Sequence, residues 1–340
     1  MPPLSVLDLV GKDAAAILHN LTTNEVKSLE ANGPGVETFI TNVKGKCIGH
    51  VLVFRTNEGY RLIGAAGQSA VIAAQMDRYT IREDAVPQVR DEEFQAWLVV
   101  QSKDTRVARP PDKKNTHPLY RSEISLHPRG DSSGGHSKEV RSVPTYGVPW
   151  IGTGSPFSGL LVLTEKADDV SSRGISDALG GRLGTTDATF AELAGDVAND
   201  RFRELRVAAG YPWFGTDFND THLPQEISRE EETISFTKGC YLGQETIARL
   251  DALGQVQKKL VSWSIEGGGD GPPPGPDTKL FAGGEKPVGR LTSVVRIDSQ
   301  DGGQPRVLAI GFARRSHFDA GAEATGTIGE LTFVARVVEN

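Results

Sequence analysis

The 340-residue sequence predicts an α+β protein with two related α+β modules and a C-terminal all-β module. Helical and strand patterns alternate in the first hundred residues, the same alternation returns in the middle of the chain, and only strand patterns follow residue 276. Glycine and proline, 39 and 19 residues, favour many turns over long helices. We expect three domains, over 1–105, 106–254 and 255–340.

The first module combines two amphipathic helices with short strands. Apolar residues at a spacing of three to four predict helices over 14–21 and 68–79. Runs rich in valine, isoleucine and phenylalanine, separated by glycine-bearing turns, predict strands over 36–40, 47–54, 60–63 and 94–100. This order is typical of helices that pack on one face of a mainly antiparallel sheet.

The middle of the chain contains a polar, turn-rich stretch from about residue 103 to 145, which predicts surface loops. Its histidines lack metal-ligand spacing, so we expect no metal site at His117, His127 or His136. A strand over 160–163 and helices over 170–179 and 188–193 then repeat the alternation of the first module.

The C-terminal part of the sequence has a different pattern. Residues 267–276 read G-G-G-D-G-P-P-P-G-P, which predicts a turn or short linker. Short strand patterns with turns between them follow over 287–297, 307–312, 324–328 and 331–338. Their number and spacing favour a small β-barrel.

Composition and charge narrow the class of protein. The net charge of −7 excludes a generally basic nucleic-acid-binding surface but leaves room for a local patch. Arg314 and Arg315, for example, either face an anionic partner or form an exposed basic pair.

No apolar run approaches the roughly 20 residues that cross a bilayer, and the first residues resemble no targeting leader. Two cysteines, Cys47 and Cys240, favour a reducing compartment. We expect a cytoplasmic protein without a membrane or direct nucleic-acid partner.

One of these cysteines falls in a predicted turn between a strand and a helix. Residues 234–237 predict the strand, 238–243 a turn with two glycines, and 244–250 the helix. Backbone N–H groups and the helix dipole at such a turn lower the pKa of a thiol, and Lys238 adds positive charge. Cys240 would then be a nucleophile, a redox switch or a soft-metal ligand. The alternative is a small apolar residue that fills a gap under the turn.

The same segment resembles the signature of the YgfZ family, folate-binding proteins implicated in iron–sulfur cluster assembly and repair and related to the glycine-cleavage T protein, an aminomethyltransferase. Residues 238–245 read K-G-C-Y-L-G-Q-E, and Ala248 and Arg249 follow. Flanking runs agree in order: V-G-K-D-A at 10–14, T-N-E-V at 23–26, F-I-T-N-V-K-G-K at 39–46, L-P-Q-E at 223–226, P-V-G-R-L-T-S at 287–293 and A-I-G-F-A at 309–313. The resemblance extends from about residue 6 to the end and is weakest over 103–145.

The resemblance implies two ferredoxin-like α+β modules and a C-terminal β-barrel around a central, folate-sized channel. It implies tetrahydrofolate or a related folate as cofactor, with Asn42, Arg206 and Glu226 at its site, and no metal bound by the chain alone. It also implies that Cys240 is the working thiol. The other signature residues would shape the turn, the helix start and the local charge: Lys238, Gly239, Tyr241, Gly243, Gln244, Glu245 and Arg249.

Two departures from the enzyme branch bear on activity. Gly49 and His50 occupy the hairpin positions where aminomethyltransferases have an acidic pair, so a permanent negative charge is missing there. Ala208 occupies the glutamate position of an R-x-E-A-G motif, which removes an acceptor for the pterin ring. Each lost charge-assisted hydrogen bond would cost about 1.5–3 kcal/mol of discrimination. Glu226 is the candidate replacement.

The leading interpretation is a non-hydrolytic factor that supports assembly or repair of iron–sulfur proteins. Its partners would be iron–sulfur client or assembly proteins, and its small ligand a folate. One alternative is a folate-dependent one-carbon transferase, an enzyme similar to the aminomethyltransferases. The other is a scaffold whose folate channel has decayed and whose Cys240 is structural.

Overall fold

The computed structural model describes residues 4–102, 121–126, 141–151, 157–166, 170, 175, 196–254, 256–267, 271–297 and 305–339. The helices expected over 170–179 and 188–193 lie almost entirely outside these residues. So do the three loop histidines, His117, His127 and His136. Over the residues that the structure describes, no helix is long and apolar enough to span a membrane.

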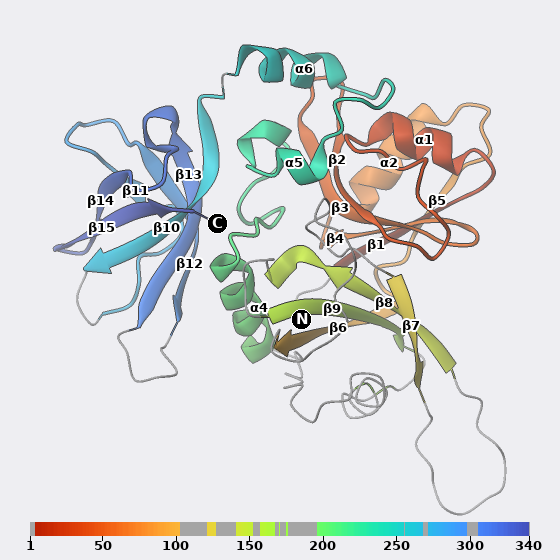
Figure 1. The fold of residues 1–340 in the computed structure, drawn as a ribbon, viewed down its shortest axis with the longest axis horizontal. Helices are drawn as coiled ribbons and strands as arrows, with labels where there is room; N and C mark the ends of the chain where they lie inside the picture. Colours follow the sequence, from red (N-terminus) through yellow and green to blue (C-terminus); the bar gives the residue numbers. More distant parts are fainter. Residues whose placement is uncertain are drawn as a thin grey trace, which may run out of the picture.

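The first module is a five-stranded antiparallel sheet with two helices on one face (Figure 1). Along the chain it runs β1 (Leu4–Val10), α1 (Ala14–Leu21), β2 (Val36–Thr41), β3 (Cys47–Arg55), β4 (Gly59–Ala65), α2 (Ser69–Tyr79) and β5 (Val86–Val89). The strand order β2-β3-β4-β1-β5 is that of a ferredoxin-like sheet with one additional edge strand, β2. Both predicted helices are confirmed; β1 and β5 had not been predicted.

The second module repeats this topology. Its strands are β6 (Phe94–Ser102), β7 (Arg121–Leu126), β8 (Arg141–Val148) and β9 (Phe157–Glu165), with the short helix η1 (Pro149–Ile151) and then α4 (Asp196–Ala208). The antiparallel order β7-β8-β9-β6 matches β2-β3-β4-β1. β6 therefore belongs to the second sheet, although we had expected the first domain to extend to residue 105.

Two strands correct the prediction that residues 103–145 are loops throughout. β7 and β8 pair with each other from Arg121↔Tyr146 to Leu126↔Arg141, and β8 pairs with β9. Turn-rich sequence on both sides hid these short strands, and β7, an edge strand, carries only two strongly apolar residues. Edge strands are commonly short and charged, and β7 carries Arg121 and Glu123.

The C-terminal module is a nearly closed barrel. Its strands are β10 (Lys258–Gly267), β11 (Lys279–Leu280), β12 (Gly289–Ile297), β13 (Arg306–Arg314), β14 (Glu323–Ile328) and β15 (Leu331–Val338), in the order β11-β12-β13-β10-β15-β14. The two edges meet where Phe281 and Thr325 exchange backbone hydrogen bonds of 2.8 and 2.7 Å. The predicted barrel is confirmed, with β10 as a further central strand.

Between the second module and the barrel, residues 209–257 run across the molecule (Figure 1). They contain the short helices η3 (Pro224–Glu226) and α5 (Glu230–Thr233) and then α6 (Gln244–Leu253), and η4 (Arg315–His317) follows β13. The strand predicted over 234–237 is wrong. Ser235 N donates to Thr23 O, but the segment is otherwise irregular because α5 ends immediately before it.

Shared cores join the three modules. One face of the first sheet packs on the second sheet and α4, through side chains such as Phe54, Tyr146 and Phe202. A second core links the first module to the outer face of the barrel, with Phe39 and Phe312 among its members. These buried apolar contacts hold the three modules against one another.

A buried ion pair strengthens the contact between α4 and the barrel. Arg206 Nη1 donates to Asp217 Oδ2 at 2.7 Å, and Arg206 Nη2 donates to Ser293 Oγ of β12 at 2.7 Å. Asp217 also accepts from Thr292 Oγ1 and from Ser293 Oγ, both at 2.6 Å. Both terminal nitrogens of Arg206 and both oxygens of Asp217 thus have partners, which buried charges require.

We expect Asp217→Ala to reduce the free energy of unfolding by about 3–5 kcal/mol, because it leaves the Arg206 guanidinium buried without a counter-charge. Asp200→Ala is the matched control, since Asp200 pairs with Arg203 on the exposed face of the same helix and should cost less than about 1 kcal/mol. Denaturant unfolding of both variants measures the difference. Equal losses would contradict the assignment of Arg206 to the module contact.

Candidate functional site

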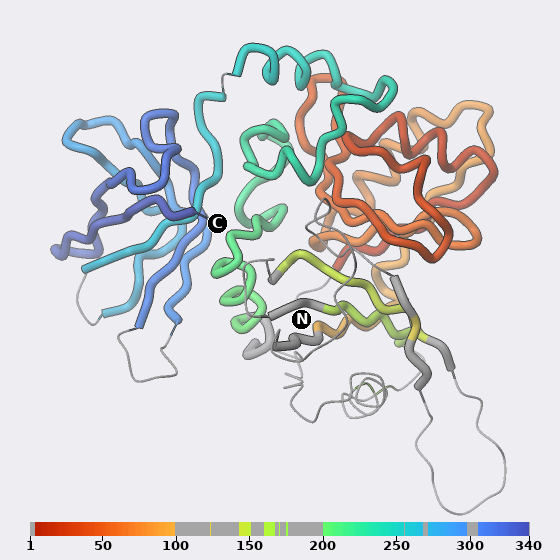
Figure 2. Tube along the Cα trace, viewed as in Figure 1, coloured from red at the N-terminus to blue at the C-terminus, as the bar shows by residue number. Residues whose placement is uncertain are grey.

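The signature turn places Cys240 at the surface, ahead of α6. Cys240 is exposed, whereas the other thiol, Cys47, is buried, so the two do not form a disulfide. Figure 2 shows the segment running along the first module before α6 leads toward the barrel. The alternative in which Cys240 fills a gap under the turn is wrong, because its side chain faces solvent.

Close contact between two glycines fixes this turn against the first module. Gly243 has φ +82°, and a Cβ on it would lie 2.5 Å from Asn42 O and 2.6 Å from Gly45 Cα. Gly45 has φ +73° and a Cβ there would meet Gly243 O at 3.1 Å. Only glycine permits both this conformation and this approach. Thr41 Oγ1 adds a 2.6 Å hydrogen bond to Leu242 O.

Lys238 binds the end of α1 and does not act beside the thiol as the sequence suggested. Its Nζ donates to the carbonyl oxygens of His19, Thr22 and Asn24 at 2.7, 2.6 and 2.8 Å. Cations are favourable at a helix C-terminus, where carbonyl groups lack helical partners. Burial lowers the pKa of Lys238 to about 8. The residue is a bridge between the signature and the first helix.

The remaining signature residues support the turn or face solvent. Tyr241 is buried with Ile234 and Ile247, and its ring lies 5.1 Å from Lys238 Nζ. Gln244 Oε1 accepts a 3.3 Å hydrogen bond from Tyr241 N, which links the first residue of α6 back to the turn. Three further signature residues are exposed: Gly239, Glu245 and Arg249.

A buried polar cluster, missed from the sequence, lies at the centre of the molecule. Glu37 on β2 accepts from Arg229 Nε at 2.5 Å and Nη2 at 2.6 Å, and its Oε1 lies 2.7 Å from His50 Nε2. Burial alone would raise the pKa of Glu37, but the guanidinium and the imidazole hold it far below its usual range. The carboxylate is therefore ionised and fully paired.

Aromatic rings pack around this cluster and leave little free space. His50 is stacked between Phe39 and Tyr211, with ring centroids 4.8 and 5.7 Å away. Arg229 lies over the Tyr211 ring at 4.8 Å. A cavity of about 10 Å³ adjoins His50 and Tyr211 and is closed by Trp150 and Trp213. Such a volume holds about one water molecule.

The three residues that the resemblance assigns to folate do not converge on this cavity. Asn42 Oδ1 accepts from Lys44 N and Lys46 N within its own turn. Glu226 Oε2 accepts a 3.0 Å hydrogen bond from Leu223 N and caps η3, and Arg206 lies in the ion pair described above. Ala208 is exposed at the end of α4.

In the hairpin, packing and a hydrogen bond occupy both positions of the missing acidic pair. A Cβ at Gly49 would lie 2.7 Å from Ile72 Cδ1, and His50 is committed to Glu37. Within the part of the chain that the structure describes, the cavity at this centre leaves room for about one water molecule and not for a pteridine. Among the described residues, no group of three or more histidine, cysteine or acidic side chains is placed to hold a metal ion.

Lys238→Met should detach the signature from α1 and lower the free energy of unfolding by about 2 kcal/mol, because three carbonyl oxygens lose a charged donor. Lys44→Met, on the exposed hairpin tip, is the control and should be nearly neutral. Amide hydrogen exchange checks the location of the effect, which should concentrate at the end of α1 and over 238–243. Unchanged exchange there would contradict a bridging role.

Comparison with protein-family models finds no match. The tRNA-modifying protein YgfZ of Colwellia psychrerythraea is 40% identical over 57 residues, 16% of this chain and 18% of that protein. The YgfZ of Cronobacter sakazakii is 31% identical over 104 residues, 30% of this chain and 31% of the relative. A putative chloroplastic transferase of Arabidopsis thaliana is 24% identical over 192 residues, 53% of this chain and 41% of the relative. Each match spans less than half of the relative's length.

The fold itself has a solved counterpart. The glycine cleavage system aminomethyltransferase T of Bartonella henselae matches with a TM-score of 0.69 at 14% identity, over 99% of this chain and 83% of that chain. The expected fold class, two α+β modules with a C-terminal barrel, is thereby confirmed. Taken with the partial YgfZ matches, this makes the chain a YgfZ-like protein with the fold of the glycine-cleavage aminomethyltransferase.

Proposed function

We propose that this protein supports the assembly or repair of iron–sulfur proteins through the thiol of Cys240. The observation that carries the proposal is an exposed cysteine on a turn whose backbone is fixed by Gly243 and Lys238. A thiol held in this way can be presented to a large partner, because it is exposed among the residues that the structure describes.

The chemistry that we propose is coordination. Thiolates are the soft ligands that iron in clusters prefers. When the Cys240 sulfur binds an iron ion of a client cluster, its proton passes to solvent, and no electron is transferred. Gly239, the residue before Cys240, is also exposed and has no side chain that would stand in the way of the client.

Aminomethyl transfer is the less favoured function. The tight packing at Gly49 and the pairing of His50 with Glu37 argue against an ionised group free to face a folate nitrogen. The likeness to the aminomethyltransferase concerns the fold, at 14% identity. A decayed-channel scaffold shares the closed centre, but it gives no reason for an exposed cysteine.

The proposal extends to location and partners. Two unpaired cysteines suit a reducing compartment, and we propose the cytoplasm. The partners would be iron–sulfur client or assembly proteins. The YgfZ relatives are named tRNA-modifying proteins; a client enzyme that modifies tRNA would connect that name to the proposed role.

Cys240→Ala should abolish complementation of a strain that lacks its own YgfZ-like protein, measured as the activity of an iron–sulfur enzyme in extracts. The melting temperature should stay within about 1 °C of the wild type, since the lost side chain is exposed. Cys47→Ala is the matched control. It should be destabilised by about 1 kcal/mol through a small cavity, yet complement. Full rescue by Cys240→Ala would refute the role of the thiol.

Tetrahydrofolate should give no saturable heat in calorimetry and no rise in melting temperature. A ligand at 100 times its dissociation constant would stabilise the fold by about 2.7 kcal/mol, so a binding site of ordinary affinity could not escape detection. A saturable heat would reinstate folate binding by Asn42, Arg206 and Glu226 and would show that the centre opens.

A further inference from the structure

A band of basic side chains lies on the outer face of the barrel, where the barrel meets the first module. Lys258 is directly opposite Arg314, and Arg290 is opposite both Phe312 and Lys279. Cross-strand partners and residues two apart share a face of a sheet. Four cations from four adjacent strands therefore line one surface.

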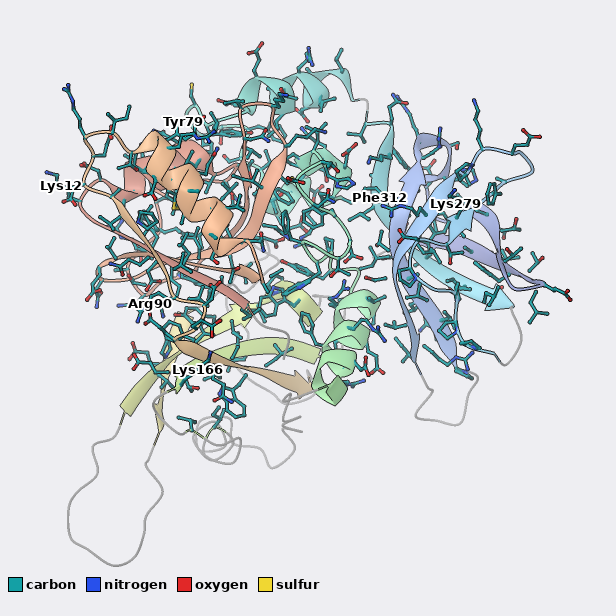
Figure 3. The ribbon with its side chains drawn as sticks, turned by 180° about the vertical axis from the view of Figure 1, so that it is seen from behind. Lys12, Tyr79, Arg90, Lys166, Lys279 and Phe312 are labelled. Atoms are coloured by element: carbon teal, nitrogen blue, oxygen red, sulfur yellow. The ribbon has the colours of Figure 1, made fainter. Side chains whose placement is uncertain are left out.

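This face is the outer one, because the alternate residues fill the barrel. Ala313, Leu280 and Leu291 belong to the barrel core. Figure 3 shows Phe312 and Lys279 on the barrel, with Phe312 nearer to the first module. The cations are at least partly accessible: Lys258 is half-buried, and Lys279, Arg290 and Arg314 are exposed.

A histidine lies at the base of the band and joins it to the first module. The His222 ring is stacked on Phe312, with centroids 4.7 Å apart and planes at 11°, and Lys258 Nζ lies 4.8 Å from the same Phe312 ring. Cys47 N donates to His222 O at 2.9 Å, which places the preceding residue, Lys46, beside the stack. Lys46 of the first module thus lies at the seam with the basic band of the barrel.

The His222 imidazole lies next to these cations. Its Nδ1 lies 3.2 Å from Asn219 N and 3.0 Å from Asn219 Oδ1, which holds the ring against the turn that precedes it. The residue is only 5% exposed. The pKa of His222 is lowered to about 4. Burial is the largest cause, the charge of Lys258 is the next, and Lys46 and Arg290 have smaller effects. The positive charges are therefore close enough to act on the ring.

We infer that this basic seam, made of Lys46, His222, Lys258, Arg290 and Arg314, binds a phosphate group. Guanidinium and ammonium groups are the usual partners of phosphate oxygens. Asp277 accepts a hydrogen bond from Arg290 and offsets one of the charges. In a chain of net charge −7, so local an excess of cations favours an anionic ligand.

The side chains of the seam suit the oxygens of a phosphate group better than the bases of a nucleic acid. His222 and Phe312 cover each other's faces and are buried, so they offer no platform on which a base could stack. The phosphate can belong to a small phosphorylated molecule or to a nucleic-acid backbone. The inference does not depend on the proposed role of Cys240, and either can fail without the other.

The test follows the imidazole signals of the protein by NMR as a function of pH, with the signal of His222 identified by its loss in His222→Gln. Inorganic pyrophosphate at millimolar concentration should raise the pKa of His222 by about one unit, because a nearby anion favours the charged ring. Lys258→Gln combined with Arg290→Gln should raise that pKa without any anion and should remove the response to pyrophosphate.

Lys259→Gln is the matched control. Lys259 is adjacent in sequence but on the other face of β10, with its Nζ 4.8 Å from the Phe318 ring, so the pyrophosphate response should persist. A single-stranded RNA in place of pyrophosphate distinguishes the two sources of phosphate. Tighter binding with a steep salt dependence identifies a nucleic-acid backbone, and a response to pyrophosphate alone identifies a small molecule.

Three results would overturn the inference. The first is a His222 signal that responds to neither anion. The second is an equal response to pyrophosphate in the Lys258→Gln, Arg290→Gln variant, which would place binding elsewhere. The third is a stronger response to an oligoglutamate peptide than to either phosphate ligand, which would assign the seam to an acidic protein segment.

Discussion

The backbone contact between Gly243 and the hairpin over 42–46 is the constraint on which both candidate surfaces depend. A side chain at 243 would collide with Asn42 O and Gly45, so the signature turn and the hairpin lie in direct contact. On one side this contact fixes the turn that carries Cys240. On the other, Cys47 N at the end of the same hairpin binds His222 O and defines the basic seam. One hairpin therefore sets the positions of a thiol and of an anion-binding surface.

Two buried ion pairs determine how the modules meet around that hairpin. Glu37–Arg229 joins β2 to the segment before α5, and Arg206–Asp217 joins α4 to β12 through Ser293. Buried pairs add little net stability, because desolvation offsets the Coulomb attraction. They do penalise wrong arrangements, since any shift leaves a charge unpaired. Their value here is a single relative position of three modules, with the apolar cores supplying most of the free energy.

Local periodicity predicted both helices of the first module, its hairpin and most of the barrel, because each depends on nearest neighbours in the sequence. The YgfZ-like motif located the turn and Cys240. It did not predict the contacts of Lys238. The ammonium group of Lys238 donates to carbonyl oxygens 214 to 219 residues earlier in the chain. Glu37 and Arg229 are 192 residues apart, and nothing in a strand pattern tells which distant cation a buried carboxylate will meet. Polar pairs between residues far apart in the chain are therefore the part of the structure that could not be predicted from local sequence patterns.

The change of the acidic hairpin pair to Gly49 and His50 has a consequence for where function resides. The first position now packs on Ile72, and the second binds Glu37, so the negative charge at the centre belongs to Glu37. Arg229 neutralises it with two hydrogen bonds. A carboxylate that is already paired and buried exerts little net electrostatic field on a ligand. The cavity beside it holds only about one water molecule. With the centre so occupied, the Cys240 thiol and the cations around His222 are accessible groups at the surface of the described part of the chain.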